Sequence, residues 1–406
     1  MLLRWLAGYL VSLAVMPSQF LGEYDTGSTT DWSDVQQREG ITITNHQVDS
    51  TNAAKIDFCE IHQNKKSPKA KDQKVIIYAV GNGDFYENHM RDYVRLTKKY
   101  PSYKIVGFNF RGTVASKGRA WSENDWINDC IAVIEHYRKQ GIATENILLN
   151  GHSMGGAITT MAAAKLYSQD VAKAKKSNRS AKDVKSVKLI NNRSFSNLAD
   201  EIIVSLLGKS ASAAITGILY GSLIGIIAGF SMLASIAVVT AALFATLYTT
   251  PMVVQNLLYP WMNGLLWLTF GTMDAASAYK SLPEGAVDHI VAKHDAIIQN
   301  KAGLHHALKS HNTLRKNQLR DIIQQEKNSA KVKAAEAELL NIKDSKVRYS
   351  DDPTHGFEAH NADLNMLSTY HKLRARSAED KLPQQLSAED VMDNKIQRLF
   401  KAKAKA

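Results

Sequence analysis

One serine in this sequence stands in a setting that could make it a nucleophile. Gly151, Ser153 and Gly155 form a Gly-x-Ser-x-Gly pattern. Residues 147–150 read as a short buried strand and residues 157–167 as an Ala-rich helix, which is the strand-turn-helix setting that this pattern needs. The flanking glycines leave room for a sharp, strained turn. We therefore predict a serine nucleophile at this turn, beside helix-start N–H groups that can stabilise an oxyanion.

The elements that would position this serine alternate between strands and helices. Residues 41–48 and 55–63 alternate in polarity and are joined by turn residues, so they predict a hairpin. Strand-like apolar runs then precede helical segments at residues 86–99, 121–139 and 157–168. Such alternation predicts an α/β protein with a doubly wound, mostly parallel sheet. A chain of 406 residues is long enough to bury a large core.

An uncharged run dominates the second half of the chain, because no Asp, Glu, Lys or Arg occurs between Lys209 and Asp274. Residues 211–248 can supply two transmembrane helices of about 20 residues each. The Trp- and Tyr-rich stretch that follows, broken by Pro260, is typical of a membrane interface. We therefore expect an apolar helical lid insertion that enters the membrane as a transmembrane hairpin. The alternative is a large soluble lid of apolar helices.

The distribution of charge indicates an anionic partner. The formal net charge is +11, and basic residues gather at 165–193 and 395–405. Such runs favour an anionic membrane surface, with the catalytic domain on the cytosolic side. Two solvated faces are the alternative. No stacking aromatics interleave with the basic residues, so we expect no nucleic acid partner.

Two further features concern the compartment. Cys59 and Cys130 lie in strand-like and helix-like runs and imply no disulfide framework. The apolar start of the chain is either a signal peptide or a buried or interfacial segment. The two cysteines by themselves are compatible with a reducing compartment.

Together these residues resemble the α/β-hydrolase superfamily, in its ABHD-type members. Beyond the serine motif, FNFRGTVASKG (residues 108–118) resembles the superfamily's loop after the fourth strand. YAVGNGDFYE stands where the family carries a His-Gly-x oxyanion loop, with Val80 in place of the usual His. The resemblance implies an oxyanion hole formed by the backbone N–H groups of Asn82 and Met154. We expect no cofactor, and no metal, because the spacing of His305, His306 and His311 matches no ligand pattern.

The resemblance also supplies an acid and a base. VAKHDAIIQNKAGL resembles the family's acid segment, which implies Asp295 as the acid. His355 and His360 both follow the last expected strand. His360 is favoured because it precedes Asn-Ala-Asp and the expected final helix, with His355 as the alternate. The chain order Ser, Asp, His is the one that this fold uses.

These features divide the chain into a core and its additions. The expected segments are an N-terminal apolar segment and linker (1–40), the first part of the core (41–200), the apolar insertion (201–273), the acid strand (274–304), a charged helical hairpin (305–345), the last strand and helix (346–376) and a basic C-terminal tail (377–406).

The predicted activity is that of a membrane-associated serine hydrolase. Ser153 would attack an acyl ester or thioester of a lipid or acylated substrate, with an acyl-enzyme intermediate that water resolves. A peptidase of the same fold and a catalytically inactive, membrane-anchored interaction protein are the alternatives. GHSMGGA with INNRSFSNL further resembles the SidB-like effector hydrolases that Legionella-type bacteria inject into host cells. That resemblance implies that the basic tail belongs to a secretion signal.

Overall fold

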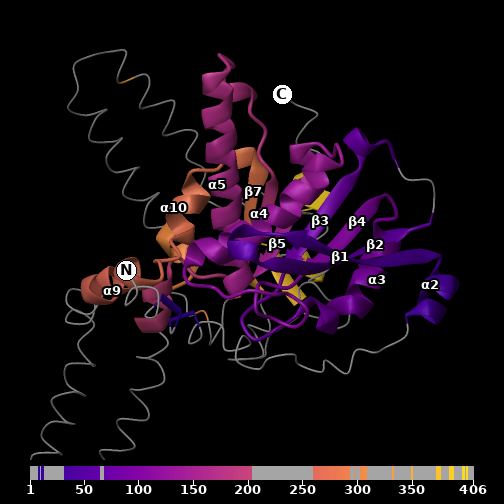
Figure 1. The fold of residues 1–406 in the computed structure, drawn as a ribbon, viewed down its shortest axis with the longest axis horizontal. Helices are drawn as coiled ribbons and strands as arrows, with labels where there is room; N and C mark the ends of the chain where they lie inside the picture. The colour runs from indigo at the N-terminus through magenta and orange to yellow at the C-terminus, as the bar shows by residue number, and fades with distance from the viewer. Residues whose placement is uncertain are drawn as a thin grey trace, which may run out of the picture.

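The computed structural model describes residues 32–64, 68–203, 259–292 and 302–308, with short pieces at 8–9, 11–12, 298, 332, 349–350, 372–375, 384–387, 396–397 and 399–400. Within these residues strands and helices alternate from β1 to β7 (Figure 1), which confirms the predicted α/β class.

The described strands join into a 10-stranded sheet in the order β1-β2-β4-β3-β5-β6-β7-β8-β9-β10. Their bounds are Ile41–Asp49 (β1), Lys55–Gln63 (β2), Lys74–Ala79 (β3), Tyr103–Phe108 (β4), Ile147–His152 (β5), Lys188–Asn192 (β6), Val287–Ala292 (β7), Tyr349–Ser350 (β8), Lys372–Ala375 (β9) and Gln384–Ser387 (β10). The strands from β4 to β8 in this order pair in parallel, whereas β1, β2 and β4 pair antiparallel, as do β8, β9 and β10. The predicted hairpin and mostly parallel sheet are therefore confirmed, in the strand order of the α/β-hydrolase fold.

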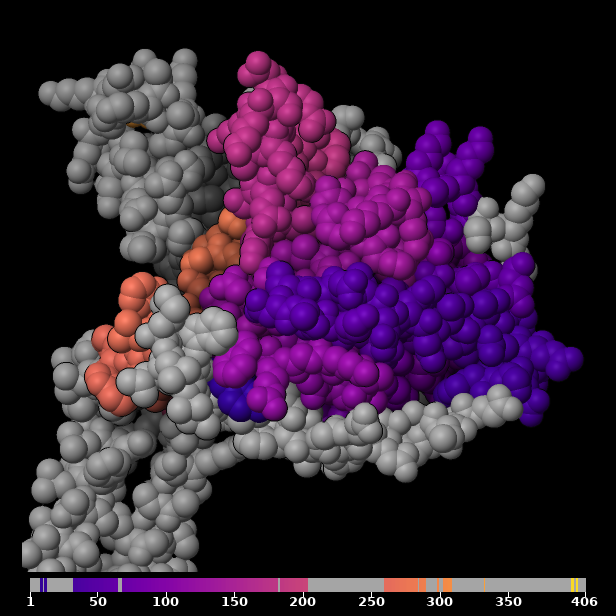
Figure 2. Space-filling view, in the orientation of Figure 1, coloured from indigo at the N-terminus to yellow at the C-terminus, as the bar shows by residue number. Residues whose placement is uncertain are grey.

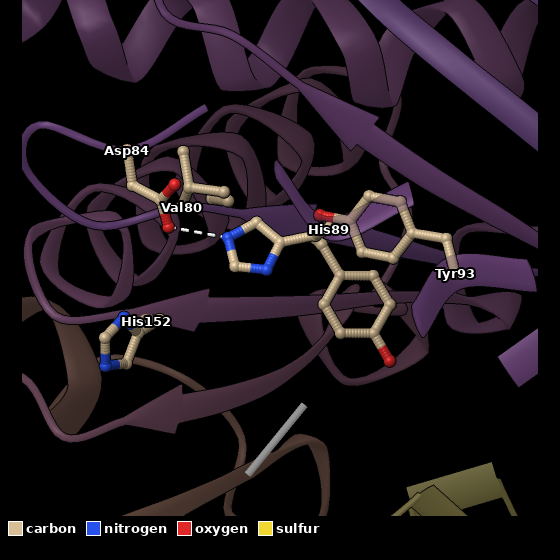
Figure 3. Close-up of a pocket in the computed structure, with 7 residues that line it drawn as sticks. Val80, Asp84, His89, Tyr93 and His152 are labelled. Atoms are coloured by element: carbon tan, nitrogen blue, oxygen red, sulfur yellow. Dashed lines mark hydrogen bonds and ion pairs between the residues drawn. The ribbon is translucent and has the colours of Figure 1, made fainter. Parts of the chain in front are cut away.

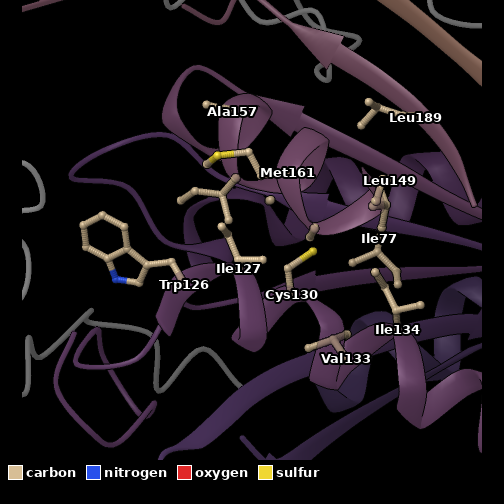
Figure 4. Packing of buried hydrophobic residues seen from close by; sticks show 14 of the residues in the cluster. Ile77, Trp126, Ile127, Cys130, Val133, Ile134, Leu149, Ala157, Met161 and Leu189 are labelled. Carbon is tan, nitrogen blue, oxygen red and sulfur yellow. The ribbon is translucent and has the colours of Figure 1, made fainter. Parts of the chain in front are cut away.

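Helices cover both faces of the sheet, because the central strands are apolar on both sides. The helices concerned are Met90–Lys99 (α3), Glu123–Lys139 (α4), Met154–Lys176 (α5), Tyr259–Thr269 (α9) and Ala275–Lys280 (α10), with the short helix Ser33–Glu39 (α2) at the hairpin edge. On β3, Ile77 and Ala79 belong to the core beneath α4 and α5, whereas Ile76 and Tyr78 pack toward α3. Figure 4 shows the first of these cores, in which Trp126 and Cys130 of α4 gather near Met161 of α5.

A buried ion-pair network fixes the start of α4 against the end of β4. The guanidinium of Arg111 lies 2.9 Å from a carboxylate oxygen of Asp125 and 2.6 Å from one of Asp129. All three side chains are at most 5% exposed. Arg111 also donates to the Ser50 hydroxyl at 3.1 Å, which joins the β1–β2 turn to the same network.

In the C-terminal part the described residues include two strands. Lys372–Ala375, within the range expected to hold the last strand and helix, pairs antiparallel with Gln384–Ser387, within the expected basic tail. Ile396, Leu399 and Phe400 are buried in the core beside α3. The apolar side chains recur with helical spacing among lysines, so the charge of this range concealed a packing face.

The uncharged insertion is only partly described. Its predicted transmembrane stretch, residues 211–248, lies outside the described residues, as does most of the predicted charged hairpin. Among the helices that are described, none has both the length and the apolar composition for a membrane crossing.

Candidate active site

The sheet brings two loops together at the carboxyl ends of β3 and β5. These strands are parallel neighbours, and the chain proceeds from β3 to β4 on one side but returns to β5 on the other. Ligands of open α/β sheets bind outside the carboxyl ends of the strands at such a switch point. The loop after β3 begins at Val80, and the turn after β5 holds Ser153. Both predicted reactive segments therefore lie at the position that the topology favours.

Ser153 has the strained geometry that its motif predicts. Its φ is 52° and its ψ is −123°, between the end of β5 and the first residue of α5, Met154. The side chain is largely buried, and its N–H donates to the carbonyl of Asn192 on β6 at 2.9 Å. A Cβ at Gly155 would collide with the backbone carbonyls at the end of β3, so only glycine permits α5 to pack this closely. The turn is thus held by both neighbouring strands.

The backbone bonds decide which N–H group at the turn can face an oxyanion. Because the Ser153 N–H is taken by Asn192, the next donor along the chain is that of Met154. Met154 is the first residue of α5, where N–H groups have no acceptor within the helix and the helix dipole is positive. This arrangement suits the predicted role of Met154.

The loop after β3 lies directly against the serine. A Cβ placed on Gly81 would be 3.2 Å from the Ser153 Cβ and 3.3 Å from Nδ1 of His152. Asn82, the other predicted donor, is the next residue and is solvent-exposed in a turn. Its backbone is therefore close to the serine, at the open side of the site.

A histidine–aspartate pair stands at the end of this loop, and the sequence reasoning missed it. Nε2 of His89 lies 2.6 Å from Oδ2 of Asp84, while Oδ1 of Asp84 accepts from the Phe85 N–H at 2.9 Å and from Nδ2 of Asn88 at 2.8 Å. Burial alone would raise the pKa of Asp84, but these hydrogen bonds and the charge of His89 outweigh it and lower the pKa. Asp84 therefore anchors the loop after β3 to the short helix Tyr86–His89 that leads into α3.

A small pocket separates this pair from the serine turn. It is lined by the ends of β3 and β5 and by α3, with Val80, Asp84, His89, Tyr93 and His152 around it (Figure 3). Val80, which replaces the histidine usual in the resembling family, contributes an apolar wall. In the sequence, Asp84 and His89 are only two polar residues five positions apart in a loop. That pattern is too common to predict their contact before the fold is known.

Strand β6 lies beside β5, on the side away from β3, and holds the start of α5. Nδ2 of Asn191 donates to the Gly156 carbonyl at 3.0 Å and to the Thr160 hydroxyl at 2.9 Å, which ties β6 to the first turns of α5. Asn191 is fully buried, and so is the neighbouring Ser194. The start of α5 is therefore held by polar contacts as well as by packing.

The remaining predicted residues are not placed by this structure. Asp295, His355 and His360 all lie outside the described residues. The described part of the site thus contains the predicted nucleophile, Ser153, and the predicted oxyanion donors, Asn82 and Met154. The acid and the base stay predictions.

Comparisons with known proteins agree with the fold. A family model described as serine aminopeptidase, S33, matches residues 73–177, the segment from β3 to the end of α5. No curated protein sequence matches the chain.

Solved structures of hydrolases resemble the chain at low identity. An α/β hydrolase from Vibrio vulnificus is 14% identical, with 87% of this chain and 88% of that chain covered and a TM-score of 0.46. An esterase from Pyrococcus furiosus is 13% identical, with 67% and 77% covered and a TM-score of 0.36. A bacterial heroin esterase is 14% identical, with 41% and 47% covered and a TM-score of 0.28. Likeness at this level does not define a function.

The assignment therefore rests on the strand order, on the strained serine between β5 and α5 and on the family match across that segment. The chain has the α/β-hydrolase fold, and these findings support a hydrolase.

Proposed function

We propose that the protein is a membrane-associated serine hydrolase that cleaves an acyl ester or thioester of a lipid or acylated substrate. The observation that carries the proposal is the strained backbone of Ser153 between β5 and α5, beside the loop after β3. Strain of this kind costs of order 1–3 kcal/mol and persists where the surroundings enforce it. The strained turn places Ser153 at the carboxyl ends of the central strands, where a substrate carbonyl can approach.

In the proposed mechanism His360 accepts the proton of the Ser153 hydroxyl as the hydroxyl oxygen attacks the substrate carbonyl. Asp295 orients the imidazole and stabilises its cation. The N–H groups of Met154 and Asn82 donate to the oxyanion of the tetrahedral intermediate, and each such donor is worth roughly 3 kcal/mol. His360 then protonates the leaving group, and water resolves the acyl-enzyme with the same groups.

Labelling with a fluorophosphonate probe tests the nucleophile without knowledge of the substrate. The full-length protein is expected to label, and Ser153→Ala is expected to abolish the reaction. Ser168→Ala, at an exposed position on the same helix α5, is the matched control and keeps it. Labelling of Ser153→Ala at the parent rate would rule out this hydrolase.

The choice of base has its own test. His360→Ala is expected to remove hydrolysis, because loss of a triad member costs several orders of magnitude in rate, while His355→Ala keeps much of it. The reverse result would assign the base to His355 and leave the fold and the nucleophile unchanged.

Membrane association is supported by the uncharged run over residues 210–273 and by the exposed apolar side chains of α9. The basic residues before the run place the catalytic domain on the cytosolic, anionic side in this proposal. Delivery into a host cell as an effector is the corresponding proposal for a bacterial source. The full chain is expected to stay with membranes through a carbonate wash, and a variant with residues 211–248 replaced by a short Gly-Ser linker is expected to be released more easily. Release of the full chain by salt alone would contradict an inserted hairpin.

Peptide hydrolysis is the second candidate, because the matching family model is described as a serine aminopeptidase. It shares the nucleophile and differs in the leaving group. Parallel assays of an aminoacyl amide and an acyl ester of equal chain length decide between them, and faster cleavage of the amide would favour the peptidase. A protein that labels at no serine would instead fit an inactive interaction protein.

A further inference from the structure

Helix α9 exposes its apolar side chains to solvent. Trp261 is 64% exposed, Trp267 68%, Leu268 57% and Leu265 42%. Trp261, Leu265 and Leu268 recur at helical spacing and therefore lie on one side of the helix. We call these three residues and Trp267 the outward face of α9. Large exposed apolar patches on a folded protein mark interaction sites.

The opposite face of α9 is firmly part of the fold. Leu266 is 3% exposed, and Tyr259 and Met262 pack against the same core as α4 and α5. Directly after the helix, Phe270 stacks edge-on against Trp126 of α4 with ring centroids 5.0 Å apart. The outward face is therefore held in a fixed orientation. Figure 2 shows α9 protruding from the body of the protein.

The chemistry of the surroundings indicates what covers this face. No charged residue occurs in α9, which ends the uncharged run that begins after Lys209. The N-terminal apolar segment arrives at the same place, since a Cβ on Gly8 would be 3.1 Å from the Thr269 carbonyl at the end of α9. Two apolar segments from distant parts of the chain thus meet here.

Aromatic rings and a cation lie beside this meeting point. The ring of Tyr9 is 5.0 Å from that of Trp121, and the guanidinium of Arg119 lies 5.5 Å from the Tyr9 ring. Trp and Tyr are enriched where lipid head groups meet acyl chains, and exposed arginine attracts anionic head groups. Apolar side chains, amphipathic rings and a nearby cation suit a phospholipid interface better than a purely aqueous or purely hydrocarbon surrounding.

The outward face is also coupled to the serine turn. Nδ2 of Asn197 donates to the Tyr259 hydroxyl at 3.0 Å, and the Leu198 N–H donates to the Thr272 carbonyl at 2.9 Å. Asn197 lies in the segment after β6, and Leu198 begins the helical residues 198–203. Strand β6 ends at Asn192, the acceptor of the Ser153 N–H, so these hydrogen bonds connect α9 with the segment that follows the strand beside the serine turn.

We propose that the outward face of α9 lies in the interfacial zone of a phospholipid bilayer and brings the carboxyl ends of β3 and β5, beside Ser153, to the lipid surface. This inference rests on the proposed function, because it takes Ser153 as the nucleophile. It adds that the lipid contact is made by a helix of the core, so that a substrate reaches the serine from the interface. A second copy of the chain is the competing occupant of this face.

Fluorescent probes at single cysteines test the contact. The native Cys59 and Cys130 are fully buried, and burial raises the pKa of both thiols, so they stay unlabelled. Leu265→Cys and Leu268→Cys each carry a nitrobenzoxadiazole label in the full chain, and Gln37→Cys on α2, which is exposed at the far end of the molecule (Figure 1), is the control.

With phosphatidylcholine vesicles, with or without phosphatidylserine, the two α9 probes are expected to shift to shorter emission wavelength. Spin labels near the head groups should quench them more than spin labels deep in the acyl chains, and the Gln37→Cys probe should not respond. Absence of a vesicle-dependent shift at both α9 positions overturns the proposal. So does a shift without lipid that grows with protein concentration, which identifies a second copy, or stronger quenching by the deep labels.

Kinetics separate this proposal from the proposed function. The double variant Trp261→Glu, Trp267→Glu is expected to hydrolyse a vesicle-embedded ester at least about tenfold more slowly, because interfacial binding scales with buried apolar area. Its fluorophosphonate labelling and its hydrolysis of a water-soluble ester should match those of the control Gln37→Glu. Full activity of the double variant on the embedded ester overturns the α9 proposal. A parent that does not label at Ser153 overturns the proposed function, while the probe shifts still decide the lipid contact.

Discussion

The pair of Asp84 and His89 gives the most direct test of how the fold holds the loop after β3, the predicted oxyanion loop. We predict that His89→Ala slows the reaction of Ser153, because it removes the 2.6 Å contact at the end of that loop. His89→Gln keeps a neutral N–H donor at this position and is expected to restore part of the rate. Arg138→Gln is the matched control, since Arg138 makes a comparable 2.9 Å pair with Asp170 between α4 and α5.

The expected size follows from the exposure of the pair. A hydrogen bond between charged groups contributes about 1.5–3 kcal/mol, and the partial exposure of His89 (18%) and Asp84 (31%) favours the lower half of that range. If the whole loss appears in the placement of the loop, about 1.5–2.2 kcal/mol corresponds to a rate reduced roughly 10- to 40-fold. That is below the roughly 100- to 1000-fold cost of deleting an oxyanion donor, because the Asn82 N–H is displaced and not removed.

The assay is the second-order rate constant for fluorophosphonate labelling, measured across pH together with thermal unfolding. The folded pKa of Asp84 is lowered, so its stabilising contribution is full above the pKa of an unfolded Asp and is lost as pH falls through the lower folded pKa. The advantage of the parent over His89→Gln should therefore shrink in acid, as Asp84 is protonated.

Two outcomes would refute this reasoning. One is labelling of His89→Ala at the parent rate. The other is a loss of rate in His89→Ala and Arg138→Gln that is proportional to their losses of stability, which would make the Asp84 pair an ordinary structural contact with no influence on the loop.

Two other predictions concern buried charge. Arg111→Met leaves the carboxylates of Asp125 and Asp129 buried without their cation and should lower the free energy of unfolding by about 3–5 kcal/mol in urea titrations, far more than a half-exposed pair would cost. Glu123 accepts the Met273 N–H, and burial raises its pKa, so its buried charge costs stability as pH rises through the folded pKa. Glu123→Gln keeps the acceptor without the charge, and its unfolding temperature relative to the parent should rise from acidic to neutral buffer.

The serine turn could be predicted from the sequence because its requirements are local. An apolar strand-like run and two glycines flanking the serine lie within residues 147–157 and predict a strained turn. The structure has that turn, with φ 52° at Ser153. The central strands were equally readable, since an apolar run bounded by turn residues has few alternatives in a chain of this kind. Local rules therefore predicted the strained turn at Ser153 and the sheet around it.

Contacts between distant or chemically mixed segments could not be predicted in this way. Asp84 and His89 meet only because a short helix turns the chain back between them. The burial of Phe400 was not predicted because lysines surround it in the sequence. In the structure the ammonium groups of Lys74 and Lys188 lie 5.0 and 5.3 Å from its ring. Lys74 begins β3 and Lys188 begins β6, and these strands come near each other only in the assembled sheet, where β5 lies between them.

The strain at Ser153 yields a last prediction that separates an active hydrolase from a chain that merely keeps the fold. Ser153→Ala retains the positive φ and its cost of about 1–3 kcal/mol, whereas Ser153→Gly removes that cost and adds about 0.5–1 kcal/mol of unfolded-state flexibility. Both variants lose the hydroxyl, so the difference between their free energies of unfolding reports only the cost of the backbone conformation. Ser153→Gly should therefore be more stable than Ser153→Ala by about 0.5–2 kcal/mol in thermal or urea unfolding, although neither reacts with the probe. A glycine that is no more stable would mean that the turn carries no strain, and the main reason for assigning chemistry to this serine would be lost.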